Sequence, residues 1–361
     1  MIINESISIK PLHALLLGIW TEKEEKTTAN SLLLELSMLA KTAGIDVAQS
    51  ELIKLRDKSP ATLLGKGKLE EIQSLIETCQ ADSVIFDIQL SPLQQRNLEA
   101  LWNVRVFDRS ELIIQIFAQR AHTKEAQLQV ELARMQYFLP RLLHAHDDLH
   151  RQKGGRYGTK DSGEKQLELD RRYIENRIQQ IKKEIIEVRK IRQTQRKRRE
   201  KSGIPHVALV GYTNAGKSTL FNRLTKADVY AENKLFATLD TTTRRMNFGS
   251  HGLILTDTVG FIRNLPHGLV AAFKATLEEA IFSDLLLIVV DASDSECEEH
   301  LKTTRMVLEE IGCAGITAYI VKNKIDAGDV NPHLAADFRV SALTGEGFPQ
   351  LLDFLKTVIA R

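Results

Sequence analysis

Apolar residues are spaced differently in three successive stretches of the chain. In the first stretch, short apolar runs occur at residues 12–20, 83–87 and 104–107. Helix-like stretches alternate with these runs, at residues 30–41, 68–79 and 92–102. Short apolar runs bounded by polar residues are typical of strands, and strands that alternate with helices usually pair in parallel. We therefore expect residues 1–120 to form an α/β domain with a mostly parallel sheet.

The second stretch, residues 121–200, has a helical pattern. One apolar stripe with spacings of three and four consists of Leu128, Leu132, Met135, Leu139 and Leu142. A second stripe, interrupted by Arg171, consists of Leu167, Ile174, Ile178, Ile181, Ile185 and Val188. Two such stripes pack together as an antiparallel helical hairpin. The segment between them, "HRQKGGRYGTKDSGEKQ", is a glycine-rich basic tip that no hydrophobic core requires.

The third stretch, residues 201–361, again alternates strands and helices, and it contains "VALVGYTNAGKSTLFNRL" at residues 207–224. Here an apolar strand leads through Gly211 and Gly216 into a helix. The backbone N–H groups of such a turn favour a polyphosphate, while Lys217 can reach the β- and γ-phosphates and Ser218 can ligate Mg²⁺. The loop residues that we expect at the nucleotide are Gly211, Tyr212, Thr213, Asn214, Ala215, Gly216, Lys217, Ser218 and Thr219.

Three shorter motifs follow in a consistent order. "LILTDTVGFI" places Asp257 after an apolar strand, where it can hold Mg²⁺ through water, and Gly260 where its N–H can meet a γ-phosphate. "AYIVKNKIDAG" places Asp326 where its carboxylate can accept from both N1–H and the exocyclic amine of guanine. "RVSALTGEG" supplies a loop that can close over the base. The expected binding residues in these motifs are Asp257, Thr258, Val259, Gly260, Asn323, Lys324, Ile325, Asp326, Ser341, Ala342 and Leu343. Together the motifs predict a guanine-nucleotide switch domain on a doubly wound sheet.

Charge is distributed unevenly along the 361 residues. Residues 151–201 contain 18 Lys and Arg against 8 Asp and Glu, a net +10, whereas the other residues contain 31 against 39, a net −8. This basic segment is either a solvated helix face or a surface for nucleic acid. No apolar run approaches 18 residues, and the three cysteines show no paired spacing, so we expect no transmembrane segment, no disulfide framework and a reduced, cytoplasmic setting.

The motifs resemble those of the HflX family of ribosome-associated P-loop GTPases. The resemblance runs through nearly the whole chain and includes "SPLQQRNLEALW", "VRVFDRSELIIQIFAQRA", "QLQVELARMQYFLPRL", "GYTNAGKSTLFN", "LFATLDTTTRR", "DTVGFIRNLPHGLVAAFKATLEEA", "NKID" and "SALTGEG". It implies a GTPase that binds the large ribosomal subunit and its RNA and that splits or rescues stalled ribosomes under stress. It further implies that Thr238 ligates Mg²⁺ only with the γ-phosphate present, and that Phe236, Ala237, Thr238, Leu239 and Asp240 line the nucleotide.

The sequence departs from the family pattern at three places. The tip reads "GGRYGTKDSGEKQLE" where the family has "GGIGTRGPGETQLE", and Thr241 replaces a proline. The sequence also ends after the helix expected to complete the GTPase domain, so activities of a further C-terminal domain are not carried over. We expect a monomer that binds GTP and GDP but not DNA, and peripheral association with membranes is left open.

The expected catalytic residues are Lys217, Thr238, Asn214 and Gly260, and the expected Mg²⁺ ligands are Ser218, Thr238 and Asp257. Many GTPases place a glutamine directly after the glycine equivalent to Gly260 to orient the attacking water, but this chain has Phe261. We therefore expect slow hydrolysis until the ribosome, a side chain supplied in trans or a potassium ion completes the site. Asn214 either positions such a K⁺ or caps the phosphate loop.

Two other classes of function remain as alternatives. One is an RNA remodeller that uses ATP or GTP, and the other is an RNA-binding module in which the nucleotide is only structural. "NKID" argues against the use of ATP in the C-terminal domain. The segment "LLGKGKLEE" at residues 63–71 lacks the spacing of a second phosphate loop, and we interpret it as a basic turn.

Overall fold

The computed structural model describes residues 12–22, 25–146, 160–200, 203–226, 235–249, 251–265, 277 and 279–359. The chain divides into two compact units. One comprises Met1–Ile116 and Leu132–Gln180, and the other comprises Phe117–Glu131 and Ile181–Arg361. Compactness alone thus assigns part of the helical region to each unit, and the expected division into three domains remains a prediction.

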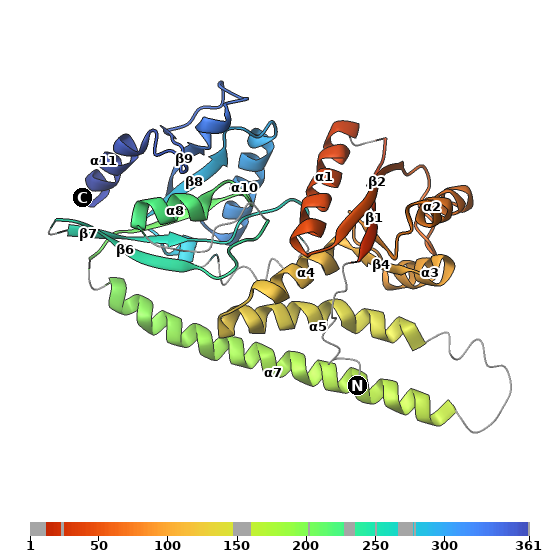
Figure 1. The fold of residues 1–361 in the computed structure, drawn as a ribbon. Coiled ribbons are helices and arrows are strands. Elements are labelled where there is room, and N and C mark those ends of the chain that lie inside the picture. The colour runs from red at the N-terminus through yellow and green to blue at the C-terminus, as the bar shows by residue number, and fades with distance from the viewer. Residues whose placement is uncertain are drawn as a thin grey trace. The chain divides into compact units, whose positions relative to one another are not determined.

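The first unit contains a four-stranded sheet with the order β2-β1-β3-β4, in which every neighbouring pair is parallel. The strands are β1 (His13–Trp20), β2 (Asp46–Lys54), β3 (Ser83–Phe86) and β4 (Arg105–Asp108). The parallel sheet expected from the apolar runs is therefore confirmed (Figure 1). Strand β2 was missed because it lies at the edge of the sheet, where most of its residues are only half-buried and its polar sequence has no strong apolar pattern.

The helices of this unit are α1 (Lys26–Thr42), α2 (Lys66–Cys79) and α3 (Pro92–Trp102), and α4 (Arg109–Arg120) begins in it. Ser91 and Gln94 form a reciprocal capping box at the start of α3, with Pro92 in the first turn. The interpretation of residues 63–71 as a basic turn was wrong. Gly65 caps α2, so most of these residues form the first turns of an amphipathic helix that buries Leu69.

The helical stretch forms α5 (Lys124–His146) and α7 (Lys160–Glu200). On α7 four residues of the predicted stripe are buried, namely Ile174, Ile178, Ile181 and Ile185. Val188 is half-buried, and the side chain of Leu167 is outside the described part of the chain. Within the second unit, ion pairs join the start of α5 to the second half of α7: Arg192 Nε lies 2.7 Å from Glu125, and Lys124 Nζ lies 3.6 Å from Glu184. Most of the predicted basic tip, at residues 150–159, lies outside the described residues.

The second unit contains a six-stranded sheet with the order β10-β9-β8-β5-β7-β6. The strands are β5 (His206–Gly211), β6 (Thr242–Phe248), β7 (His251–Asp257), β8 (Leu285–Asp291), β9 (Thr317–Asn323) and β10 (Phe338–Arg339). All pairs are parallel except β6 with β7. The helices are α8 (Lys217–Thr225), α10 (Cys297–Ile311) and α11 (Phe348–Ile359), with a 3₁₀ turn, η1 (Ile325–Ala327). The predicted doubly wound sheet is confirmed (Figure 1).

Parallel pairing places the carboxyl ends of the central strands at one edge of this sheet. Strand β5 ends at Gly211, β7 at Asp257, β8 at Asp291 and β9 at Asn323. The strand interiors are nearly completely buried, with Leu209 and Leu287 fully inaccessible. A rigid core therefore presents these polar strand ends together.

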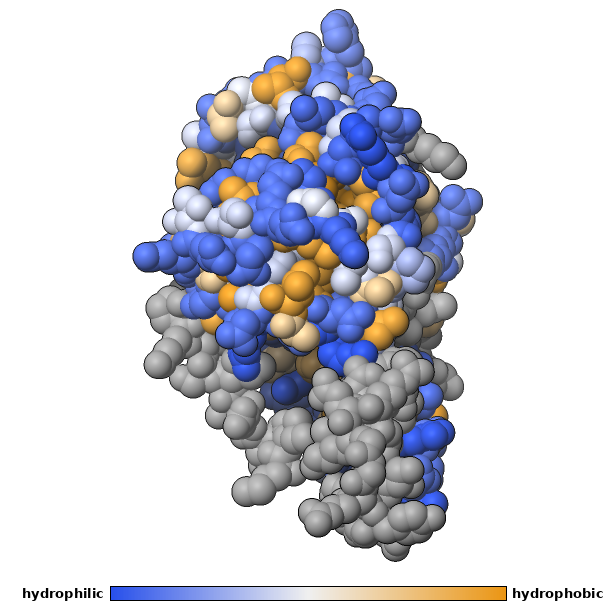
Figure 2. Space-filling model, turned by 90° about the vertical axis from the view of Figure 1, so that its right-hand side faces the viewer, coloured by the Kyte–Doolittle hydropathy of each residue, from blue (hydrophilic) through white to orange (hydrophobic). Residues whose placement is uncertain are grey.

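Hydrophilic residues cover most of the coloured part of the face drawn in Figure 2, and apolar residues form smaller groups between them. Among the described residues, no helix is both long enough and apolar enough to cross a membrane.

Candidate nucleotide site

The phosphate loop connects β5 to α8 in a conformation that the sequence supports locally. Asn214 and Gly216 both have left-handed backbone angles, with φ of 62° and 86°. Asparagine tolerates this region better than most residues, and glycine adopts it freely. A side chain at Gly216 would also collide with the amide of Asn323, which donates to the carbonyl of Ala215 at 3.0 Å. The loop is therefore packed directly against the end of β9.

Lys217 lies at the floor of this loop and is almost completely buried. Its ammonium donates to the carbonyls of Tyr212 and Gly211, at 2.7 and 3.1 Å. Burial lowers the pKa of Lys217 to about 8, although the neighbouring Asp257 opposes this change. A Cβ at Gly260 would approach Thr213 Cα at 2.7 Å and Lys217 Nζ at 2.9 Å, so only glycine allows the backbone after β7 to come this close to the loop.

Three oxygen-bearing side chains converge beside Lys217. Ser218 Oγ lies 2.6 Å from Thr238 Oγ1 and donates to Asp257 Oδ2 at 2.6 Å. Burial raises the pKa of Asp257 to about 6 despite the hydrogen bond from Ser218 and the charge of Lys217. The other carboxylate oxygen, Oδ1, is buried and makes no hydrogen bond within the described part of the chain.

This donor set fits Mg²⁺. Magnesium binds hard oxygen ligands and usually keeps several waters while taking one or two protein ligands beside substrate phosphates. The hydroxyls of Ser218 and Thr238 and the incompletely bonded carboxylate of Asp257 supply such oxygens next to the phosphate loop. P-loop GTPases in general use this ion.

The opposite end of the site is built from the segment after β9. Asn323 is fully buried, and its Oδ1 accepts from the N–H of Ala342 at 2.9 Å. Lys324, with φ of 63°, extends toward the phosphate loop, and its ammonium lies 2.7 Å from Asp291 at the end of β8. Asp326 follows in η1 with its side chain at the cavity. The carboxylate of Asp326 can accept from two adjacent N–H groups of a base.

The loop after β10 is held by a residue that the sequence interpretation did not single out. Arg223 of α8 donates to the carbonyls of Ala342, Leu343 and Thr344, at 3.2, 2.7 and 2.8 Å. Nothing in the local sequence around Arg223 identifies this role, because its partners lie more than a hundred residues further along the chain. Asp291 was missed as well, although an Asp at the end of the apolar run "LLLIVV" was a usable signal.

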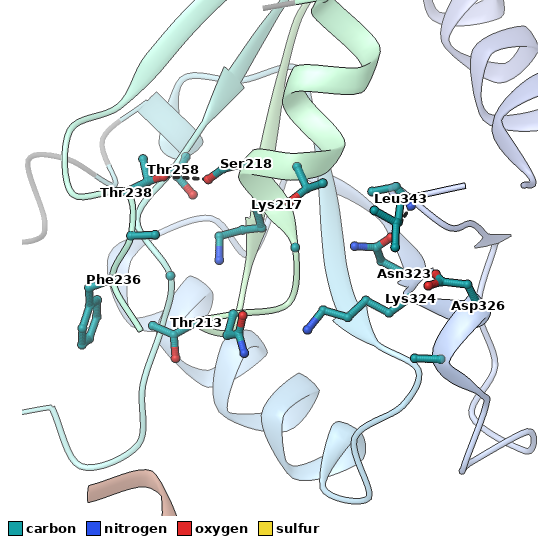
Figure 3. A pocket seen from close by; sticks show the side chains of 17 residues that line it. Thr213, Lys217, Ser218, Phe236, Thr238, Thr258, Asn323, Lys324, Asp326 and Leu343 are labelled. Carbon is teal, nitrogen blue, oxygen red and sulfur yellow. Dashed lines mark hydrogen bonds between the residues drawn. The ribbon is translucent and has the colours of Figure 1, made fainter. Parts of the chain in front are cut away.

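A cavity of about 330 Å³ connects the two ends (Figure 3). Ser218, Thr238 and Thr258 lie at one end and Asp326 and Leu343 at the other, with both lysines between. Its walls include the predicted residues Thr213, Asn214, Gly216, Lys217, Ser218, Thr219, Phe236, Ala237, Thr238, Thr258, Gly260, Asn323, Lys324, Asp326, Ala342 and Leu343, together with Ala327, which was not predicted.

The remaining predicted residues do not line the cavity: Gly211, Tyr212, Ala215, Leu239, Asp240, Asp257, Val259, Ile325 and Ser341. Most of these support it, as Gly211 and Tyr212 do by bonding Lys217. Asp240 departs most from the expectation, because its carboxylate bonds the backbone before α5 rather than facing the nucleotide cavity.

The fold and site define a P-loop GTPase, an enzyme that hydrolyses GTP to GDP and phosphate. Three protein-family models match the chain: "GTP-binding GTPase N-terminal" over residues 30–118, "GTP-binding GTPase Middle Region" over residues 120–199 and "50S ribosome-binding GTPase" over residues 206–324.

Curated relatives agree with these matches. GTPase HflX of Lacrimispora saccharolytica is 44% identical over 363 residues, covering 99% of this chain and 85% of the relative. GTPase HflX of Escherichia coli K12 is 47% identical over 330 residues, covering 89% of this chain and 77% of the relative. The crystal structure of a GTP-binding protein from Sulfolobus solfataricus in complex with GDP is 26% identical, with a TM-score of 0.50, covering 97% of this chain and 99% of that one. The chain belongs to the HflX family of GTPases.

Proposed function

We propose that this GTPase binds the large ribosomal subunit in its GTP-bound state and couples hydrolysis to splitting or rescuing stalled ribosomes. The observation that carries the proposal is the match of residues 206–324 to a family described as ribosome-binding. The net +10 of residues 151–201 supports it, since clustered cations are suited to the phosphate backbone of RNA.

In the proposed mechanism, the phosphate loop and Lys217 bind and neutralise the phosphates, and Asp326 selects guanine. Ser218, Thr238 and Asp257 would hold Mg²⁺, which supplies electrostatic stabilisation of the charge that develops on the transferring phosphoryl group. Thr238 would join this set only with the γ-phosphate present and would thereby report which nucleotide is bound. The backbone N–H of Gly260, beside Lys217 and Thr213, would meet the γ-phosphate.

The attacking water lacks a partner where many GTPases supply glutamine. Phe261 is buried, its backbone N–H bonds Gly211 at 3.0 Å, and its carbonyl accepts from Thr213 at 2.7 Å. A side chain so placed orients no water, which favours slow hydrolysis in the free protein. The ribosome would raise the rate by completing the site.

We propose that a potassium ion is a second factor that raises the rate of GTP hydrolysis. Asn214 lines the cavity, and its side-chain amide makes no hydrogen bond within the described residues, so side-chain capping of the loop does not account for it. Its left-handed backbone conformation does favour asparagine, and that explanation competes with cation binding.

Co-sedimentation with separated ribosomal subunits tests the proposal. The protein should pellet with the large subunit in the presence of a non-hydrolysable GTP analogue and much less with GDP, and large subunits should raise the rate of GTP hydrolysis. Failure to pellet in any nucleotide state, with no change in hydrolysis, would reject the ribosomal role. A chain that bound RNA equally in all nucleotide states would instead be an RNA-binding module.

The basic tip provides a second arm of the experiment. The variant replaces three cations by alanine: Lys153, Arg156 and Lys160. Lys153, Arg156 and the side chain of Lys160 lie outside the part of the chain that the structure describes. A matched control replaces three exposed cations of the GTPase domain: Lys302, Arg305 and Lys356. Only the tip variant should weaken large-subunit binding and flatten its salt dependence, by about one unit of slope or less for each lost phosphate contact.

A further inference from the structure

The carboxylate of Asp240 binds the backbone that directly precedes helix α5. Its Oδ2 accepts from the backbone N–H groups of His122 and Thr123, at 2.9 and 3.1 Å, and its Oδ1 accepts from the Thr123 hydroxyl at 2.5 Å. Residues 117–131 belong to the same compact unit as the GTPase domain, so these bonds lie within one unit. Asp240 and Thr123 are far apart in sequence, and the contact is therefore a product of the tertiary fold.

This arrangement is a shared helix cap. Thr123 itself caps α5, because its hydroxyl oxygen accepts from the N–H of Ala126 at 3.3 Å. The N–H groups at the start of a helix have no intrahelical partners, and the helix dipole favours a negative charge there. Asp240 supplies that charge and accepts from the N–H of the cap residue Thr123 and of His122 before it. The conformation of residue 240 and the order of the first turn of α5 are consequently linked.

A second contact holds the segment that precedes Thr238 in the chain. Phe236, also buried and with a left-handed φ of 55°, packs edge to face against Phe117 at a ring-centroid distance of 4.6 Å. Residues 236–240 are thus attached at both ends to the segment around the end of α4 and the start of α5. Between these attachments, Thr238 reaches Ser218 at 2.6 Å.

We propose that Asp240 is a positioning residue that holds Thr238 at the metal site by capping α5, and that the bound nucleotide thereby controls the order of the first turns of α5. The proposal rests on the proposed function of Thr238 as the residue that joins the metal site with the γ-phosphate. With GTP, Thr238 is held inward and Asp240 stays on the cap. With GDP, Thr238 is released and the cap is weakened, so a change at the phosphate reaches the first turns of α5.

The test uses the full-length protein and the variants Asp240→Ala and Asp240→Asn. Because the cap is lost, Asp240→Ala should lower kcat for GTP about fivefold, which corresponds to about 1 kcal/mol. Its KM for GTP and its Kd for GDP should stay within about twofold of wild type, because neither the base nor the phosphate loop is touched. Asp240→Asn, which keeps one acceptor oxygen but no charge, should fall between.

Amide hydrogen exchange gives the readout that a purely structural role would not affect. In the wild type, a non-hydrolysable GTP analogue should slow exchange in the first turns of α5 relative to GDP. Asp240→Ala should remove this difference between nucleotides while leaving exchange in the strands of the GTPase domain unchanged. Thr123→Ala should weaken the difference, and Thr123→Ser, which keeps the hydroxyl, should restore it.

Two controls make the outcome decisive. Asp353→Asn removes an exposed carboxylate of α11 whose partner is Lys356 on the same helix, and it should behave as wild type in every assay. Thr238→Ala tests the proposed function separately: if it hydrolyses GTP normally, the role of Thr238 fails. If Thr238→Ala is impaired while Asp240→Ala keeps wild-type kcat and a wild-type exchange difference, the role of Thr238 stands and the positioning role of Asp240 is overturned. Should Asp240→Ala fail to fold, Asp240→Asn and Thr123→Ala decide the question by the same measurements.

Discussion

Replacing Arg223 by alanine should weaken the binding of all guanine nucleotides. The guanidinium of Arg223 bonds three successive carbonyls of the loop at residues 342–344, and it also lies 5.4 Å from the ring centroid of Phe348. Leu343 at the centre of this loop is 75% exposed, so packing of its own side chain does little to hold it, whereas the neighbouring Ala342 is buried and its N–H bonds Asn323. Without Arg223, the loop should sample many conformations, and a nucleotide must order it upon binding.

The magnitude follows from the bonds that are lost. A hydrogen bond from a charged donor contributes about 1.5 to 3 kcal/mol when buried, but Arg223 is exposed, and exposed ionic contacts contribute about 0.2 to 1 kcal/mol. If each of the three exposed bonds contributes about 0.7 kcal/mol, their loss costs about 2 kcal/mol of binding free energy. This cost corresponds to a Kd that is about thirtyfold higher. The effect should be equal for GDP and GTP, because the loop lies at the base end and not at the phosphates. The kcat at saturating GTP should therefore hardly change.

Fluorescence titration with labelled GDP and a labelled GTP analogue, together with steady-state hydrolysis, measures these quantities. Arg223→Lys should lose part of the affinity, since an ammonium cannot span three carbonyls with the geometry of a guanidinium. Arg305→Ala removes an exposed arginine from α10 and should bind both nucleotides as wild type does. A Kd for GDP within about twofold of wild type in Arg223→Ala, or a loss confined to kcat, would refute the reasoning.

Three further predictions concern the base, the catalytic cation and pH. Asp326→Asn should weaken GTP binding by several kcal/mol, because each lost hydrogen bond to the carboxylate is worth about 1.5 to 3 kcal/mol. The same variant should gain affinity for xanthosine nucleotides. Unchanged GTP affinity in a binding assay would reject the assignment of Asp326 to the base. Replacing KCl by NaCl at equal ionic strength should slow intrinsic hydrolysis, and Asn214→Ala should abolish that difference; equal rates in both salts would leave only the backbone explanation. Burial, reinforced by the charge of Asp108, raises the pKa of Glu111 to about 7. Because the raised pKa makes the folded state bind the proton more tightly, the unfolding free energy should fall by on the order of 2 to 3 kcal/mol between about pH 4.5 and pH 7. Urea titrations of Glu111→Gln should lack this decrease. If the unfolding free energies of wild type and variant changed with pH in parallel, the prediction would be contradicted.

The sequence by itself determined the features that depend on neighbouring residues. The phosphate loop is contiguous, so the spacing of Gly211, Gly216 and Lys217 specifies the turn, the helix start and the cation together. The buried stripe on α7 followed from spacings of three and four, since every turn of a helix returns the same face to its partner. The parallel sheets followed likewise from apolar runs that alternate with helices.

Tertiary structure decided which distant groups meet. Strand β2 is visible only through its pairing with β1, because an edge strand with many half-buried polar residues carries no strong apolar signal. Arg223 and Asp240 have ordinary sequence surroundings, and the partners that they bond lie more than a hundred residues away in the chain. Resemblance to a family placed Asp240 at the nucleotide, whereas the folded chain directs its carboxylate to the start of α5. Local spacing constrains a backbone conformation, but the direction of a side chain toward a remote acceptor or donor is set only when the helices and strands have packed.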